Sequence, residues 1–170
     1  LWILKELLAH LPFSIASAIV GILIMVSFTV FDKMQYLNSI FHIFYPTHLL
    51  FGAMAPTAMF WRLSHKRNIL HAIYAVIIGF TGSVILCSIS NIVLPYLGGR
   101  LFIPQMRWHF CLTEHPVVIL PFVAIGIILG FWSQALVRYN TRLAHSAHVL
   151  VSTMATLLYL IGFGMSGWLA

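Results

Sequence analysis

Acidic residues are nearly absent from this chain. Glu6, Asp32 and Glu114 are the only three among 170 residues, and charged residues of both signs make up 7% of the sequence. Soluble domains carry about 25% charged residues, so a soluble globular domain is excluded. With 61% hydrophobic residues and a mean hydropathy of +1.00, we expect an integral membrane protein.

The few cysteines and carboxylates also limit the chemistry. Cys87 and Cys111 are the only two cysteines and form no C-x-x-C or C-x-x-C-H pattern, so neither a disulfide nor a covalently attached c-type haem is predicted. The sequence contains no HExxH motif, no pair of catalytic carboxylates and no arrangement typical of a Ser-His-Asp triad. An intramembrane metalloenzyme is therefore the weakest of the functional classes that we consider.

Long apolar runs occupy most of the chain. They cover residues 11–31, 43–61, 69–94, 116–137 and 149–169, and each reaches or approaches the ~20 residues that cross ~30 Å of hydrocarbon. The runs do not alternate polar and apolar residues, as strands of a membrane barrel would. We expect an all-α, polytopic bundle of five transmembrane helices that forms one domain over residues 1–170.

Basic residues predict the orientation of these spans. With the N-terminus in the cytoplasm, six of the nine lysines and arginines fall on the cytoplasmic side, as the positive-inside rule requires. The net charge of +6 then reflects loops next to anionic lipid and not a nucleic-acid binder. We expect the lipid bilayer of the cell (inner) membrane as the location, and a long outer loop over residues 95–112, where Pro95, Gly98, Gly99 and Pro104 disfavour a helix.

A weak internal repeat relates the two ends of the chain. The second span from His48 reads HLLFGAMA, and the fifth span from His148 reads HVLVSTMA. The first and fourth spans align less strongly, with Gly21 on Gly126. Because the paired spans cross in opposite directions, the pattern indicates an inverted repeat, a device of transporters. Chance similarity between apolar helices is the alternative.

Nine histidines dominate the remaining polar chemistry. Their places at the expected span ends divide them into two groups. His48 and His115 begin spans at the outer face, where His42, His109 and Glu114 could join them; His148 begins a span at the inner face, near His145 and His71. Such nitrogen-rich sets suit nickel, cobalt, zinc, copper or iron(II) better than magnesium or calcium.

Two short spacings bear on these groups. His145-x-x-His148 places two imidazoles one helical turn apart, where they could bind one metal or serve as one exposed and one packed residue. The segment His109-x4-Glu114-His115 is similar to the His-x4-Asp-His signature of nickel and cobalt permeases, with glutamate replacing aspartate. The resemblance covers seven residues, and here they lie at a junction between a loop and a span.

Small and polar residues recur every four positions along several spans. His71, Ser83 and Asn91 follow this spacing in the third span, Gln134 in the fourth and Ser152 in the fifth. Such stripes primarily let membrane helices pack closely. Because histidines begin three of the stripes, we also predict that these residues line a pathway.

These observations favour a transporter or channel for a divalent transition-metal cation, active as a homo-oligomer. Neutral imidazoles would bind the ion and release it on protonation, so binding should weaken below pH ~6.5. The alternative is a b-type haem-binding cytochrome or a quinone-reactive anchor with bis-histidine ligation. A third interpretation is that about half of the histidines are interfacial residues that bind no metal.

Overall fold

The computed structural model describes residues 2–30, 36–64, 68–133 and 141–165. Within these ranges the chain is helical and contains no strand, which confirms the predicted all-α class. The helices are α1 (Trp2–Val30), α2 (Leu37–Leu63), α3 (Ile69–Thr81), η2 (Gly82–Cys87), η3 (Ile89–Val93), α4 (Leu94–Phe102), α5 (Cys111–Glu114), α6 (Pro116–Trp132) and α8 (Thr141–Met165).

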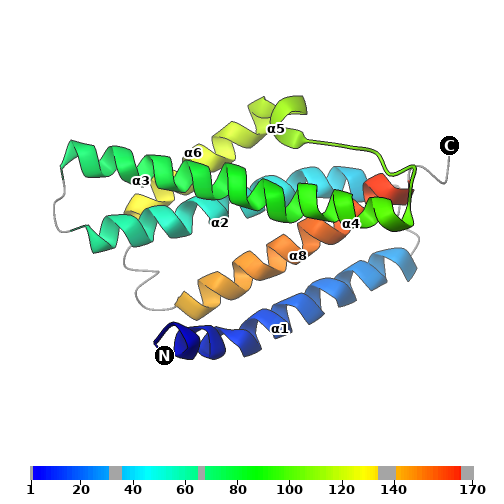
Figure 1. The fold of residues 1–170 in the computed structure, drawn as a ribbon, viewed down its shortest axis with the longest axis horizontal. Helices are drawn as coiled ribbons and strands as arrows, with labels where there is room; N and C mark the ends of the chain where they lie inside the picture. The colour runs from blue at the N-terminus through cyan, green and yellow to red at the C-terminus, as the bar shows by residue number, and fades with distance from the viewer. Residues whose placement is uncertain (1, 31–35, 65–67, 134–140, 166–170) are drawn as a thin grey trace.

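Helix α2 is the centre of the bundle. It packs against α6, α8 and α3, while α1 packs mainly against α8 and lies at the edge of the molecule (Figure 1). The buried face of α2 includes Phe41, Tyr45, Leu49 and Ala53, each at most 1% exposed. Because α2 contacts three other helices, side chains on several of its faces are buried.

Glycines allow the helices around α2 to approach closely. A Cβ atom on Gly126 of α6 would lie 2.4 Å from the carbonyl oxygen of Leu50, and one on Gly130 would lie 2.7 Å from Cβ of Thr57. On α3, a Cβ on Gly79 would overlap the Thr57 hydroxyl. The small residues in these stripes therefore act in helix packing.

The third helix differs from the expected one in length and in regularity. From Ile69 to Phe102 it is continuous, so the N-terminal half of the predicted loop over residues 95–112 is helical. Its centre contains the π-helical segments η2 and η3, and the second of them ends just before Pro95. A wider turn accommodates a proline ring that an α-helix would exclude from its interior.

Within the described ranges, two helices are long and apolar enough to cross a membrane, namely Ile69–Phe102 and His145–Gly164. Leu11–Ser27 and Pro116–Trp132 are shorter apolar helices. Helix α2 has 27 residues but carries several polar side chains, among them His42, Thr47 and His48. Large apolar side chains lie exposed on the outside of the bundle, such as Val117 at 85% and Trp132 at 81%.

Candidate metal centres

In the described part of the chain, two groups of three side chains offer ligand atoms that lie within 4.8 Å of one another. We call His42, His109 and His115 the rim cluster, and His48, Cys87 and His148 the buried cluster. The rim cluster lies at the end of the bundle where α2 and α6 begin and α8 ends. The buried cluster lies between α2, η2 and α8, about 9 Å further along α2, from the rise between His42 and His48.

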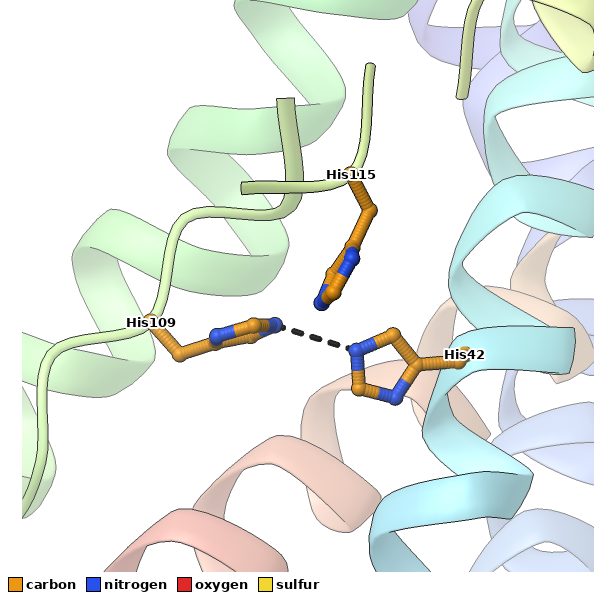
Figure 2. A group of neighbouring side chains, drawn as sticks. All are labelled: His42, His109 and His115. Carbon is orange, nitrogen blue, oxygen red and sulfur yellow. Dashed lines mark hydrogen bonds between the residues drawn. The ribbon is translucent and has the colours of Figure 1, made fainter. Parts of the chain in front are cut away.

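The rim cluster combines one helix with the loop around α5 (Figure 2). His42 Nδ1 lies 2.7 Å from the carbonyl oxygen of Asn38, and His109 Nδ1 lies 2.8 Å from Glu114 Oε2. A carbonyl or carboxylate oxygen only accepts, so both Nδ1 atoms donate to it. Each imidazole therefore keeps its Nε2 lone pair, which is the arrangement that metal-bound histidines adopt in proteins.

The Nε2 atoms of these two rings lie close together. Nε2 of His42 and Nε2 of His109 are 3.2 Å apart, and the ring of His115 lies with its centroid 4.9 Å from that of His42. Two nitrogens bound to one tetrahedral zinc at 2.0–2.1 Å are about 3.3 Å apart. The spacing of the rim cluster is thus close to that of ligands on a shared ion.

The electrostatics around His109 and Glu114 favour a neutral imidazole beside an ionised carboxylate. Burial lowers the pKa of His109, an effect that the neighbouring Glu114 partly opposes. The pKa of Glu114 is lowered, mainly because the backbone N–H of Phe110 donates to it, and also by His109. Burial raises the pKa of the Cys111 thiol, which lies 3.1 Å from His109 Nε2, to about 12.

The buried cluster is withdrawn from the surface. His48 is 3% exposed and Cys87 6% exposed. The rings of His48 and His148 are stacked with centroids 4.5 Å apart. Three ring nitrogens have no hydrogen-bond partner among the described residues, namely Nδ1 and Nε2 of His48 and Nε2 of His148. Buried imidazole nitrogens are rarely left without partners, so these orphaned atoms point to a ligand.

The local backbone makes room for Cys87. Its Sγ atom occupies the space that a side chain at position 52 would fill, because a Cβ on Gly52 would lie 2.5 Å from it. Cys87 ends the π-helical segment η2, and such wide turns often mark functional sites. A glycine on one helix and an irregular turn on another therefore bring the thiol to the two imidazoles.

A cavity of about 470 Å³ adjoins the buried cluster. His48, Cys87 and His148 line one part of it, and the cavity extends toward Pro56 and His145, near the end of the bundle where α8 begins. In the opposite direction, aromatic rings fill the space between the two clusters. Phe41 packs against Tyr45, Tyr159 and Phe163, and the first three of these four are fully buried.

The expected grouping of the histidines differs from the structure in one respect. His48 lies with His148 and not with His115, whereas His42, His109 and Glu114 gather around His115. The reason is where the helices begin. Because α2 starts at Leu37 and α8 at Thr141, His48 and His148 lie ~17 Å and ~11 Å inside their helices, and not at span ends.

The other predicted site residues have varied positions. His145 lines the cavity and lies 3.2 Å from the Ser14 hydroxyl, while the His71 ring contacts the side chain of Asn68 at the start of α3. Ser83 donates to the carbonyl of Leu49. Asn91 is buried and accepts from Ser152. Gln134 lies outside the described residues.

Cys87 is the candidate ligand that the sequence pattern does not reveal. Its place in the four-residue stripe between Ser83 and Asn91 was visible, but the stripe alone did not link it to His48 on another helix. Cys87 and Cys111 are both free and buried.

Comparisons with known proteins identify no relative, so the geometry described above is the basis for a functional proposal. The sequence matches no protein-family model, and neither the curated proteins nor the solved structures give a match.

Proposed function

We propose that this protein is a five-span membrane transporter that carries a transition-metal cation, with its N-terminus in the cytoplasm. The observation that carries the proposal is the buried cluster, in which both nitrogens of His48 and Nε2 of His148 have no hydrogen-bond partner among the described residues and the two rings stack beside a cavity. From the histidine-rich sequence we expect a divalent ion. The rim cluster, which consists of three imidazoles, suits nickel, cobalt, zinc, copper or iron(II).

The apolar exterior supports a bilayer as the surroundings of all the long helices. Exposed large hydrophobic residues occur on α1, α3 and α6, and contiguous apolar surface of this kind is unusual on a soluble monomer. Helix α2 is shielded by its neighbours, so its histidines need not face lipid. A bundle with polar residues inside and apolar residues outside is what a membrane pathway requires.

The packing of the glycines supports the inverted repeat. The alignment pairs Gly21 with Gly126, and the segment after His148 with the segment after His48. A Cβ on Gly21 would meet Thr153 and Leu150 of α8, and a Cβ on Gly126 would meet Ala53 and Leu50 of α2. The contacts of Gly21 with α8 therefore have counterparts in the contacts of Gly126 with the aligned positions of α2.

A pseudo-twofold axis of such a repeat would pass through the buried cluster. His48 and His148 are aligned residues, and they stack on each other. Cys87 lies near the middle of the single helix Ile69–Phe102 that connects the two pairs. In transporters built from inverted repeats the substrate site lies near the midplane, where the halves meet.

The difference between the two sides of the buried cluster, one open and one closed, supports alternating access. The cavity lies on one side, and the aromatic layer of Phe41, Tyr45, Tyr159 and Phe163 closes the other. With the N-terminus in the cytoplasm, the cavity faces inward and the rim cluster faces outward. An open pore would be needed for a channel, so the closed layer favours a transporter.

The alternative of a bis-histidine haem is less well supported. A haem would have to lie between two imidazole nitrogens that point at its iron from opposite sides. In the buried cluster the two rings stack face to face at 4.5 Å, which leaves no space for a macrocycle. A purified protein with a Soret band that shifts on reduction would reverse this preference.

Metal uptake into vesicles tests the proposal. Purified protein is reconstituted in liposomes that contain a metal-sensitive dye, and zinc, nickel, cobalt, iron(II) and copper are added separately. We expect uptake of at least one ion above that of protein-free vesicles, lost in His48→Ala and His148→Ala but retained in His71→Ala, a histidine outside both clusters. No uptake of any ion, or equal loss in all three variants, would contradict the proposal.

The oligomeric state stays a prediction from the size of the chain. The buried cluster and the cavity lie between α2, α8 and the third helix, the aromatic layer joins α2 and α8, and the rim cluster joins α2 to the loop around α5, all within a single chain. A homo-oligomer would therefore support the bundle without completing the pathway, and mass measurement in lipid nanodiscs tests whether it forms.

A further inference from the structure

We infer that the ion held by the buried cluster is copper(I), bound by the Cys87 thiolate and the neutral imidazoles of His48 and His148. The inference rests on the proposed function and narrows it, since it names the ion and replaces the expected divalent charge with a single positive charge. Two independent lines of reasoning lead to it, one from the ligand atoms and one from charge.

The ligand atoms restrict the choice of metal. A thiolate is a soft ligand that selects copper(I) and zinc among the first-row metals, whereas imidazole alone suits zinc, copper, iron and nickel. The ion must be accepted by the rim cluster, which has three imidazoles, and by the buried cluster, which has two imidazoles and a thiol. Copper and zinc satisfy both sites.

Charge decides between these two metals. When the metal binds, the Cys87 thiol loses its proton to solvent in the cavity and the sulfur forms a bond to the metal. One thiolate neutralises copper(I), so the bound site has no net charge, whereas a zinc ion on the same three ligands keeps one positive charge. Burying an unpaired charge in apolar surroundings is strongly unfavourable.

Among the residues whose side chains the structure describes, no carboxylate near the buried cluster would compensate a divalent ion. Among the acidic residues, Glu114 is the one whose side chain lies in the part of the chain that the structure describes, and it is bound to His109 in the rim cluster. The cavity beside the buried cluster is lined by uncharged residues such as Gly52, Leu86 and Val149, and by His145. The site is therefore suited to a complex that is neutral without further ligands.

The geometry allows the ligands to close on an ion with small movements. Ligand atoms on one metal are at most about twice the 2.0–2.3 Å bond length apart, and those of the buried cluster lie within 4.8 Å. The free nitrogens of His48 have no hydrogen bond to break. Side-chain rotations into the cavity can supply the remaining contraction.

The test is a comparison of copper(I) and zinc binding by the purified protein in detergent. Copper(I) is presented anaerobically by a chromophoric copper(I) chelator, and zinc by a zinc dye. We expect Cys87→Ser to weaken copper(I) binding by at least ~100-fold, because loss of a group that only supports a ligand already costs up to about 100-fold in metal affinity. Zinc affinity at the rim cluster should stay within about threefold of the wild-type value. Cys111→Ser is the matched control and should keep full copper(I) affinity.

X-ray absorption at the copper edge supplies a readout that does not depend on the variants. The wild-type protein should show one sulfur and two nitrogen neighbours, and the sulfur should vanish in Cys87→Ser but not in Cys111→Ser. A copper site without sulfur, or loss of the sulfur in Cys111→Ser only, would overturn the inference. Zinc on a thiolate at the buried cluster, with copper(I) bound no more tightly, would also overturn it while leaving the transporter proposal intact. Binding of neither metal would overturn both.

Discussion

The rim cluster and the buried cluster contain three ligands each but are built in opposite ways. In the rim cluster, hydrogen bonds to Asn38 and Glu114 orient two imidazoles, so the ligand nitrogens are already 3.2 Å apart. In the buried cluster, neither nitrogen of His48 has a hydrogen-bond partner among the described residues, and the site relies on packing. An oriented site suits capture of an ion from water, whereas an unsupported site suits transient holding and release.

The largest difference between the clusters should appear in transport. His148→Ala removes a ligand at the point where the two halves of the bundle meet, so we expect uptake to fall at least ~100-fold, to background. His115→Ala removes an exposed ligand from the entrance and should slow uptake by about tenfold, because the ion can still reach the inner site. Dye-loaded vesicles measure both rates. Equal losses in the two variants would show that the clusters are not functionally different.

Glu114→Gln should weaken the rim cluster by a smaller amount. The carboxylate holds the His109 ring in the tautomer that ligates metal, and loss of such a partner costs about 10–100-fold in affinity. Zinc titration of the purified protein measures the effect. Copper(I) binding that depends on Cys87 should be unchanged, and a parallel loss there would mean that Glu114 acts on the whole fold.

Glycine substitutions in the two halves of the repeat should destabilise the protein to different extents, because the glycines are packed with different tightness. Gly126→Ala brings a methyl group within 2.4 Å of a backbone oxygen, which cannot move independently, and we expect a loss of about 1–3 kcal/mol. Gly21→Ala meets a Thr153 methyl at 3.0 Å, so its cost should be smaller. Gly98→Ala has open space and serves as the control. Thermal unfolding in detergent measures all three, and equal destabilisation by Gly126→Ala and Gly98→Ala would contradict the packing.

The mildest effect concerns pH at the rim cluster. Protons compete with metal for imidazole, so affinity should decrease as pH falls. Because burial lowers the pKa of His109, this ring stays neutral below its ordinary value of ~6.5, and zinc affinity should fall less than about tenfold between pH 7.5 and 6.5. The steeper loss should begin below that range. Zinc binding that is unchanged between pH 5 and pH 8 would exclude imidazole as the main ligand.

Sequence reasoning located part of the site because some of its parts are local. His109, Glu114 and His115 are close in sequence, so their cooperation could be predicted from spacing alone. The repeat pairs His48 with His148, but the apolar runs place these two residues at opposite faces. Helix ends caused that error, because apolar runs mark the hydrocarbon-like core of a helix and not the polar turns that extend it at Leu37 and Thr141.

The sequence by itself determined the helical class, because long apolar runs favour helices. It also determined that imidazole is the commonest side chain able to bind a metal, because the chain has nine histidines but only three acidic residues and two cysteines. Tertiary structure decided which residues meet. The pairing of His48 with His148, the approach of Cys87 past Gly52 and the aromatic layer beneath the rim cluster all depend on contacts between helices distant in sequence. Such contacts follow from the packing of whole surfaces, which no local pattern encodes.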